Sequence, residues 1–294
     1  MVIIQNVADT VRNTFNFGID KFKLQGPDNL ATPFYGLFRS DNAKCVGNAV
    51  SDRYTPHTTE DVVTLVEAAE AAFDIASVQC YFRDGHYVVV EPTKDHRVQI
   101  HGTEDAVFPR VIIRAGYDGQ AFKACVGWFR DVCSNMSMME SVSDTSVSIR
   151  HTNSLTDKVD DLKKSFSQLQ KGWAFQLDLM NRMQEAKVSA HDFLFDVYPI
   201  KEDATDRQKN SHRKLIGELF ERIVEESDKI KTVKPRKETN WETSVWECFN
   251  AVQGHVQHAK TRHGDPSKFD RILKAFSDAD VKRAEKQALT LIGA

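Results

Sequence analysis

Cysteine and histidine are the residue types in this sequence most suited to covalent chemistry. Cys133 lies just after a run of bulky apolar residues, which ends at Asp131, and is followed by Ser134 and Asn135. A thiol is a nucleophile at neutral pH only when a basic partner holds it as the thiolate, and His151 is a candidate for that partner. The alternative is a small buried thiol at a strand end, with Ser134 and Asn135 forming the turn. We favour this structural interpretation.

Three histidines near the C-terminus raise the question of a metal site. His255, His258 and His263 are spaced three and five positions apart, so only the first two clearly share a face of a helix. No Asp, Glu or Cys completes a tight ligand set, and we expect a solvated polar face. The sequence also lacks the phosphate-loop, dinucleotide-binding, zinc-protease and nucleophile-elbow motifs. We accordingly predict no metal, no cofactor and no enzymatic activity.

Basic residues near aromatic rings form a third set, whose chemistry is noncovalent. Single-stranded nucleic acid needs cations for its phosphates and ring faces for its bases. The predicted DNA-binding set is Arg53, Tyr54, Arg110, Arg114, Lys123 and Arg130. Tyr54 is the stacking ring of this set. Each cation is also an ordinary residue for the solvent face of a half-buried strand, so the sequence leaves open whether the set converges in space.

Strand patterns in the first half of the chain must position these cations. Residues 34–51 have the pattern of a hairpin. The Asp-Gly pairs at residues 84–85 and 118–119 each separate two β-rich runs, which is typical of tight hairpin turns. Thr58 and Asp61 form a capping-box pattern at the start of a helix. The apolar positions of this helix share one face: Val62, Leu65, Val66, Ala69 and Phe73.

Helical spacing replaces strand alternation from about residue 152. Apolar residues recur every three or four positions from Leu155 to Met183, which predicts one long amphipathic helix that packs within the chain. Further helices are predicted over residues 205–230, 241–263 and 278–291. The order predicts an α+β fold, with an antiparallel, hairpin-rich N-terminal sheet and one packed helix, then the long helix and a helical C-terminal region. The corresponding predicted domains are residues 1–151 and 152–294.

Composition and charge indicate the class of protein and its compartment. The net charge is −3, so binding to a polyanion requires a local patch rather than a basic surface overall. The five cysteines are widely spread and form no C-x-x-C pair, which indicates reduced thiols. No run of about 20 apolar residues is present to span a membrane, and the N-terminus lacks a secretory pattern. We predict a cytoplasmic protein without a membrane partner.

Several stretches of the sequence, taken in order, carry a family resemblance. They are YGLFRSDNAKCVGNAVSDRYTPHTTEDV, PRVIIRAGYDGQAFKACVGWFRDVCSNM, IRHTNS, NWETSVWECFNAVQGHVQH and the closing QALTLIGA. Together they resemble a phage and plasmid protein family catalogued as a domain of unknown function, of the nine-hundred-thirty-two type, over about residues 34–292. Met136 departs from the glycine that the family has after Ser-Asn, so a turn that needs positive φ would be built differently here.

The resemblance implies an origin in a mobile element, near genes of replication and recombination, without an agreed activity. The predicted order of hairpin, helix, strands, hairpin and long helix is also similar to the core of single-strand annealing proteins of the Rad fifty-two type. From this analogy we expect a phage-encoded protein that binds and anneals single-stranded DNA as a homo-oligomer in the host cytoplasm. The competing hypothesis is a protein-interaction or virion-associated structural protein. A thiol enzyme that uses Cys133 is a third hypothesis.

Overall fold

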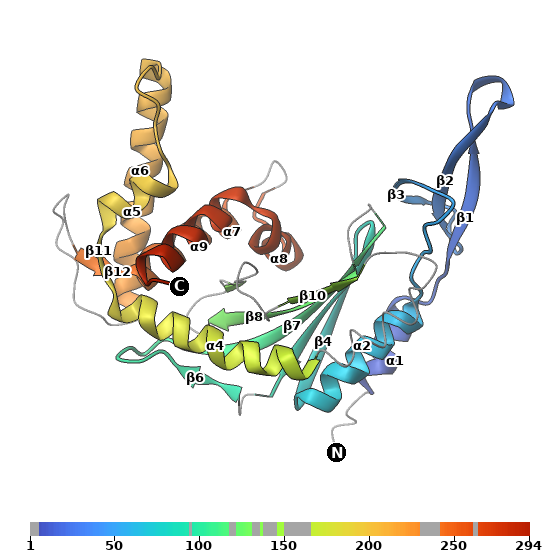
Figure 1. Cartoon of the computed structure of the whole chain (residues 1–294), viewed down its shortest axis with the longest axis horizontal. Coiled ribbons are helices and arrows are strands. Elements are labelled where there is room, and N and C mark those ends of the chain that lie inside the picture. The colour runs from blue at the N-terminus through green and yellow to red at the C-terminus, as the bar shows by residue number, and fades with distance from the viewer. Residues whose placement is uncertain are drawn as a thin grey trace. The chain divides into compact units, whose positions relative to one another are not determined.

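The computed structural model describes residues 6–93, 96–117, 122–130, 136–137, 146–149, 166–229, 242–260 and 264–294. Antiparallel sheets occupy the N-terminal half and helices the C-terminal half, which confirms the predicted α+β class (Figure 1). The chain forms two compact units. Unit 1 comprises Met1–His96, Pro109–Val126 and Ser143–Gly172; unit 2 comprises Arg97–Phe108, Gly127–Val142 and Trp173–Ala294. The predicted domain boundary at residues 151 and 152 lies outside the described residues and stays a prediction.

A three-stranded antiparallel sheet opens the β-structure of unit 1. Its strands, in the order β1-β2-β3, are β1 (Ile19–Gln25), β2 (Ala31–Arg39) and β3 (Cys45–Val50). The β2–β3 pair confirms the hairpin predicted over residues 34–51. Strand β1 has no counterpart among the predicted strands; it pairs with β2 and is joined to it by a 3₁₀ turn, η1 (Pro27–Asn29). The β1–β2 hairpin extends away from the rest of unit 1 (Figure 1).

A larger sheet forms the centre of unit 1, with its strands in the order β10-β8-β7-β5-β4. The strands are β4 (Ile75–Phe82), β5 (Gly85–Pro92), β7 (Ala106–Gly116), β8 (Phe122–Arg130) and β10 (Ser146–Ile149). The β4–β5 hairpin confirms the turn predicted at residues 84–85, and Asp84 there has a φ of 51°. The turn predicted at residues 118–119 lies outside the described residues. Strands β7 and β8 each contribute residues to both units.

Two helices of unit 1 pack beside this sheet. They are α1 (Val7–Thr14) and α2 (Thr59–Ala72), which contact each other and, respectively, β4 and β5. The capping box predicted at Thr58 and Asp61 is confirmed, with both reciprocal hydrogen bonds present. The predicted apolar face of α2 is buried, which confirms that this face belongs to the core. Helix α1 has no counterpart among the predicted helices.

Unit 2 is mainly helical. Its helical elements are α4 (Phe166–Glu185, from Trp173 onward), α5 (Ala190–Val197), α6 (Asp206–Lys229), α7 (Val245–His258), α8 (Lys268–Ser277) and α9 (Ala279–Leu291). Short strands complete it: β6 (Val98–Gln99), β9 (Met136–Ser137), β11 (Lys187–Ser189) and β12 (Glu242–Ser244). Helices α6, α7 and α9 confirm the three predicted C-terminal helices, and α7 is shorter than predicted. Helices α5 and α8 have no counterpart among the predictions.

Helix α7 lies in the core of unit 2. Trp246 and Phe249 of this helix are buried in one apolar cluster with Met180 and Met183 of α4. Trp128, in the part of β8 that belongs to unit 2, joins the same cluster and contacts Trp173 of α4. The described part of the long helix therefore packs within the chain, as its spacing predicts.

Candidate functional site

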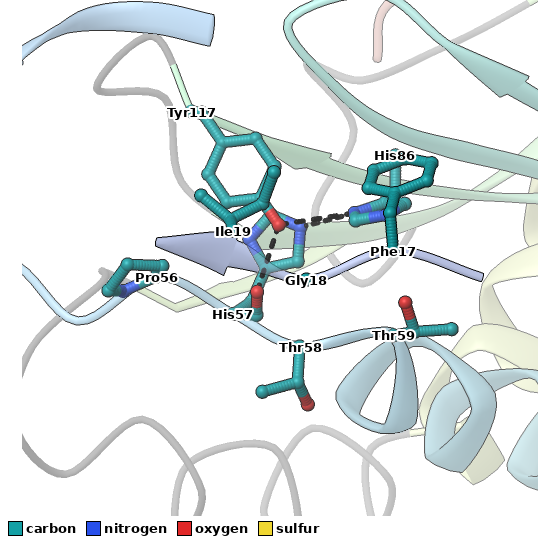
Figure 2. A pocket seen from close by; sticks show the side chains of 9 residues that line it. All are labelled: Phe17, Gly18, Ile19, Pro56, His57, Thr58, Thr59, His86 and Tyr117. Carbon is teal, nitrogen blue, oxygen red and sulfur yellow. Dashed lines mark hydrogen bonds between the residues drawn. The ribbon is translucent and has the colours of Figure 1, made fainter. Parts of the chain in front are cut away.

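Two histidines and a tyrosine form a buried, hydrogen-bonded group in unit 1, here named the His–Tyr cluster. His86 lies in β5, His57 precedes α2, and Tyr117 follows β7. The Nε2 atom of His57 lies 2.8 Å from the Nδ1 atom of His86. The Tyr117 hydroxyl donates to the carbonyl oxygen of His57 at 2.9 Å and lies 3.4 Å from the Nδ1 atom of His86. Figure 2 shows the three side chains converging.

The position of His86 depends on the glycine that precedes it. A Cβ atom on Gly85 would lie 2.5 Å from the carbonyl oxygen of Ala115 and 2.6 Å from the Cα atom of Gly116, both in the neighbouring strand β7. Real Cβ atoms do not approach backbone atoms this closely, so only glycine allows this pairing. His86 pairs with Ala115 one step further along the register. The close approach of the two strands therefore holds the imidazole of His86 in place.

Burial keeps His86 and Tyr117 uncharged. The ring of His57 stacks on that of Tyr117, with centroids 4.2 Å apart and planes 7° apart. The ring of Phe15 contacts His86 edge-on at 4.4 Å. Burial, together with the positive charge of Arg39, lowers the pKa of His86 to about 3. Burial raises the pKa of Tyr117 well above its ordinary value. His86 and Tyr117 are therefore both neutral at neutral pH.

The hydrogen bonds of Tyr117 indicate which nitrogen of His86 carries the proton. Because the Tyr117 hydroxyl donates to the carbonyl oxygen of His57, its oxygen can only accept from His86. A proton on the Nδ1 atom of His86 serves this oxygen and also the Nε2 atom of His57. In this assignment the Nε2 atom of His86 is an acceptor. It has no hydrogen-bond partner among the residues that the structure describes.

A cavity of about 150 Å³ adjoins the His–Tyr cluster (Figure 2). Phe17, Ile19 and Pro56 are its apolar lining residues, and the three rings of the cluster line it as well. Gly18 and Thr58, at the rim, are exposed, whereas every member of the cluster is at most 2% exposed. Mostly apolar concave sites with a few convergent polar groups are the general form of small-molecule binding sites. The base of β1 therefore borders a candidate ligand pocket.

Two of the six predicted DNA-binding residues lie next to the β1–β2 hairpin. Arg53 is exposed and Tyr54 is half-buried in the loop after β3. The amine of Lys21 in β1 donates to the carbonyl oxygens of Asp52 at 2.7 Å and Tyr54 at 2.9 Å. These bonds attach the hairpin to the loop on both sides of Arg53. The hydroxyl of Tyr54 donates to the carbonyl oxygen of Gly116 at 3.3 Å, which ties the tyrosine to unit 1.

Three more predicted residues share a face of the larger sheet in unit 1. Arg110 and Arg114 lie four positions apart in β7 and therefore point to the same side. The other side carries the His–Tyr cluster. His86 is opposite Ala115, the neighbour of Arg114, in the register, and His57 contacts Phe122, the neighbour of Lys123. Lys123 consequently lies on the side of the two arginines. Arg114 and Lys123 are both half-buried.

Arg110 differs from its two neighbours because it is buried and paired. Its guanidinium lies 2.7 Å from the carboxylate of Glu91, which also accepts hydrogen bonds from Ser77 and Gln79. Burial lowers the pKa of Arg110 to about 10, and the charge of Glu91 opposes that effect. This guanidinium stays protonated at neutral pH but is turned to a carboxylate rather than to solvent.

The sixth predicted residue, Arg130, belongs to unit 2 and is fully buried. Its guanidinium donates to Asp105 at 2.7 Å and to Glu226 at 2.6 Å, and the indole of Trp246 donates to Asp105 at 2.9 Å. The side chains of Arg130 and Asp105 are 0% exposed. Burial raises the pKa of Asp105, and Arg130 opposes the rise. We name these four residues the arginine–carboxylate cluster; in this conformation Arg130 does not face solvent.

The β1–β2 hairpin carries exposed rings that are not among the predicted site residues. Phe22 is 57% exposed and Phe34 is 52% exposed. Phe22 is opposite Gly36 in the register, and Phe34 lies in the stretch of β2 where the register with β1 shifts. Lys23, on the other face, is also exposed. The alternation of charged and apolar residues over 19–25 is the sequence signal that could have identified this strand.

Other predictions concern residues that the structure does not describe. Cys133, Ser134, Asn135, His151 and His263 lie outside the described residues. Among the residues that are described, no group of three or more His, Cys, Asp or Glu is placed to hold a metal ion. Within the same part of the chain, no helix combines the length and the apolar character needed to cross a membrane.

The fold and the pocket define an α+β protein with a cavity beside the His–Tyr cluster in its first unit. The chain belongs to the family described as Domain of unknown function (DUF932), whose family model matches residues 47–289. This match confirms the predicted resemblance of the sequence to a domain of unknown function. Searches of the curated proteins and of the solved structures found no match. The matched range contains the whole His–Tyr cluster, whereas β1 and β2 precede it.

Proposed function

We propose that this chain binds single-stranded DNA without covalent chemistry, along the β1–β2 hairpin and the loop that carries Arg53. The observation that supports the proposal most is the exposure of two aromatic rings, Phe22 and Phe34, on this hairpin. Exposure of an aromatic ring to water is unfavourable, and stacking of a base on the ring removes that exposure and stabilises the complex. Stacking of this kind tolerates any base sequence, as annealing requires.

Exposed cations supply the second half of the interaction, and Lys23 lies on the face of β1 opposite to Phe22. Lys23 and Arg53 are exposed, and the amine of Lys21 lies 4.6 Å from the centre of the Tyr35 ring while it holds the Arg53 loop. Phosphates would bind the exposed cations, and counterion release would make the binding salt-dependent. Arg110 and Arg130 are left out of this proposal because carboxylates already neutralise both guanidiniums. Arg114 and Lys123 remain secondary candidates on the sheet.

The proposal extends to annealing by a homo-oligomer that a phage encodes for recombination or replication in the host cytoplasm. Its support is the order of a β-hairpin, a helix, strands, a second hairpin and a long helix, which resembles single-strand annealing proteins of the Rad fifty-two type. β1 also lies at the edge of its three-stranded sheet, where backbone groups are available to pair with another strand. Light scattering with and without DNA would measure the oligomeric state.

The first experiment is fluorescence anisotropy with a labelled single-stranded oligonucleotide, at low and near-physiological salt. Binding that prefers the single strand to a duplex and weakens as salt rises is the expected result. The absence of binding at low salt would overturn the proposal. The hairpin would then be assigned to a protein partner, as the competing hypothesis of a protein-interaction or virion-associated structural protein requires.

Substitutions at the exposed rings locate the interface. Phe22→Ala combined with Phe34→Ala should weaken binding at least tenfold, because base–aromatic stacking contributes about 1–3 kcal/mol per base. Phe175→Ala is the matched control, since Phe175 is 47% exposed and lies in α4 rather than in the hairpin. Equal affinities for the double variant and the control would exclude the hairpin as the DNA interface.

A charge substitution tests the phosphate contact separately. Arg53→Ala should weaken binding modestly for every oligonucleotide sequence and lower the slope of log affinity against log salt by about one. Arg213→Ala is the matched control, because Arg213 is also exposed but lies in α6. An unchanged salt slope in Arg53→Ala would remove this residue from the interface.

A further inference from the structure

We propose that Gly36 is a positioning residue of the β1–β2 hairpin. Its lack of a side chain lets the ring of Phe38 lie against the strand, where this ring supports the exposed ring of Phe22. The inference rests on the proposed function, because its consequence is the stacking of a base on Phe22. The contacts that carry it lie entirely within the hairpin, and Gly36 itself is buried.

Two side chains cover Gly36 on the face where its own side chain would stand. A Cβ atom on Gly36 would lie 2.7 Å from the Cε2 atom of Phe38 and 2.9 Å from the Cδ2 atom of Leu24. Cβ atoms do not approach other heavy atoms this closely, so a larger residue here would displace both groups. Glycine therefore gives the ring of Phe38 its place over the strand.

The register places Phe22 directly beside the covered glycine. Phe22 is opposite Gly36 and Asp20 is opposite Phe38, so the two phenylalanines are diagonal neighbours on one face of the hairpin. Their ring centroids are 5.9 Å apart and their planes are inclined by 62°. Rings in this edge-to-face arrangement attract each other without stacking. Phe22 is therefore held by a neighbour and is still 57% exposed.

Support from Phe38 prepares Phe22 to stack on a base. An exposed side chain that moves freely loses conformational entropy when a ligand fixes it. A ring that already rests on a neighbour loses less, so the same stacking contact gives a higher affinity. Gly36 thereby acts on the interface through Phe38 and Phe22, without contacting the DNA.

The substitution Gly36→Ala should move the rings without unfolding the hairpin. The backbone at Gly36 is not left-handed, so alanine is compatible with it. The atoms nearest the added methyl group are the ends of the Phe38 and Leu24 side chains, which can rotate away. Gly85 is the opposite case, because there the nearest atoms belong to the backbone of β7.

The test measures the binding of Gly36→Ala to the labelled single-stranded oligonucleotide and the nuclear Overhauser effects between the Phe22 and Phe38 rings. Loss of the ring–ring effects and DNA binding weaker by at least about threefold are expected, with urea denaturation little changed. Gly26→Ala is the matched control in the same hairpin, because a Cβ atom there has ordinary contacts of 3.7 Å. Both measurements should be unchanged in this control.

Removal of the supporting ring separates its role from a general effect on the strand. Phe38→Ala alone should weaken DNA binding by a similar factor, and adding Gly36→Ala to it should weaken binding no further. A further loss of the same size would show that the added methyl group acts through the backbone, and would overturn the inference. Phe38→Ala also decides the question when Gly36→Ala does not fold, because unchanged DNA binding in this variant would overturn the inference as well.

The unmodified chain distinguishes the failure of this inference from the failure of the proposed function. If the unmodified chain binds the oligonucleotide and Gly36→Ala binds it equally well, the positioning role is overturned and DNA binding stands. If the unmodified chain does not bind at low salt, the proposed function fails and the positioning role fails with it.

Discussion

Each unit of this protein buries a group of polar side chains, and the two groups differ in charge. The His–Tyr cluster of unit 1 joins three rings by hydrogen bonds beside a cavity, and two of them, His86 and Tyr117, are neutral. The arginine–carboxylate cluster of unit 2 combines one guanidinium with two carboxylates and an indole, and the guanidinium is fully buried. Both groups join residues that are distant in the sequence.

The difference in charge indicates different roles. Buried ions must be compensated at all times, because a missing partner leaves a charge in a region of low dielectric. The arginine–carboxylate cluster is therefore a structural element that tolerates no missing member. The neutral rings of His86 and Tyr117 have no such constraint, and the buried Nε2 atom of His86 has no hydrogen-bond partner among the described residues. This contrast is why we assign a structural role to the buried arginine of unit 2.

The largest predicted effect comes from removing the buried guanidinium. Arg130→Met would leave Asp105 and Glu226 facing each other without a cation and should lower the free energy of unfolding by roughly 3–5 kcal/mol. Arg12→Met is the control, because Arg12 pairs with Glu60 on the surface and should change the stability little. Urea denaturation measures both variants. A similar, small loss in both would show that the arginine–carboxylate cluster is not a structural element.

A smaller effect is expected from the histidine pair. His57→Leu and His86→Leu should each lower the free energy of unfolding by about 1–3 kcal/mol, since each leaves a buried nitrogen without its partner. The double variant should lose less than the sum of the two, because it removes the pair together. His101→Leu is the exposed control. Additive losses in a double-mutant cycle would show that the two imidazoles are not coupled.

The pH dependence of the free energy of unfolding tests whether buried His86 is neutral in the folded chain. The folded chain holds the pKa of His86 at about 3, below the ordinary 6.5, so the unfolded chain binds the proton first as the pH falls. The stabilisation from neutral His86 is therefore complete above pH 6.5 and is lost progressively toward pH 3. The slope attributable to this residue is about 1.4 kcal/mol per pH unit. Denaturation of the unmodified chain and of His86→Leu over this range should show that the variant lacks this contribution.

The smallest effect distinguishes two helix caps. Ser244 caps α7 in unit 2, is fully buried and also donates to Gln184, whereas Thr58 caps α2 at an exposed position. Ser244→Ala should cost about 2 kcal/mol and Thr58→Ala about 1 kcal/mol, at the upper end and the centre of the range for such caps. Thermal unfolding of the two variants measures the difference. The reverse order would mean that burial adds nothing to the cap in unit 2.

Local patterns in the sequence predict much of the fold. The capping box at Thr58, the Asp-Gly turn before His86 and the helix α6 all depend on residues that are close in sequence, and each is confirmed. Strand β1 and the short helices α1, α5 and α8 were not predicted. These elements are short, and their contacts within each unit, such as those of α1 with α2, are not readable from local periodicity.

The sites were less predictable because they depend on contacts between distant residues. His57 and His86 are 29 positions apart, and Tyr117 is a further 31 positions along the chain. Nothing in the local sequence of any of them indicates a shared hydrogen bond. For the same reason, the sequence could not reveal that Arg130 meets Glu226 at a separation of 96 positions. Residue type alone made each arginine a candidate for phosphate, and only the fold shows which guanidiniums are already paired.

The close approach of Gly85 to β7 also turns the pocket into a reporter of strand pairing. Because β5 can lie against Ala115 only without a side chain at this position, a small separation of the two strands would displace His86 directly. The imidazole nitrogen resonances would then register the loosening of one strand pair before unit 1 as a whole unfolds. The loosening caused by pressure or gentle heating would therefore change the nitrogen resonances of His86 and of its partner His57.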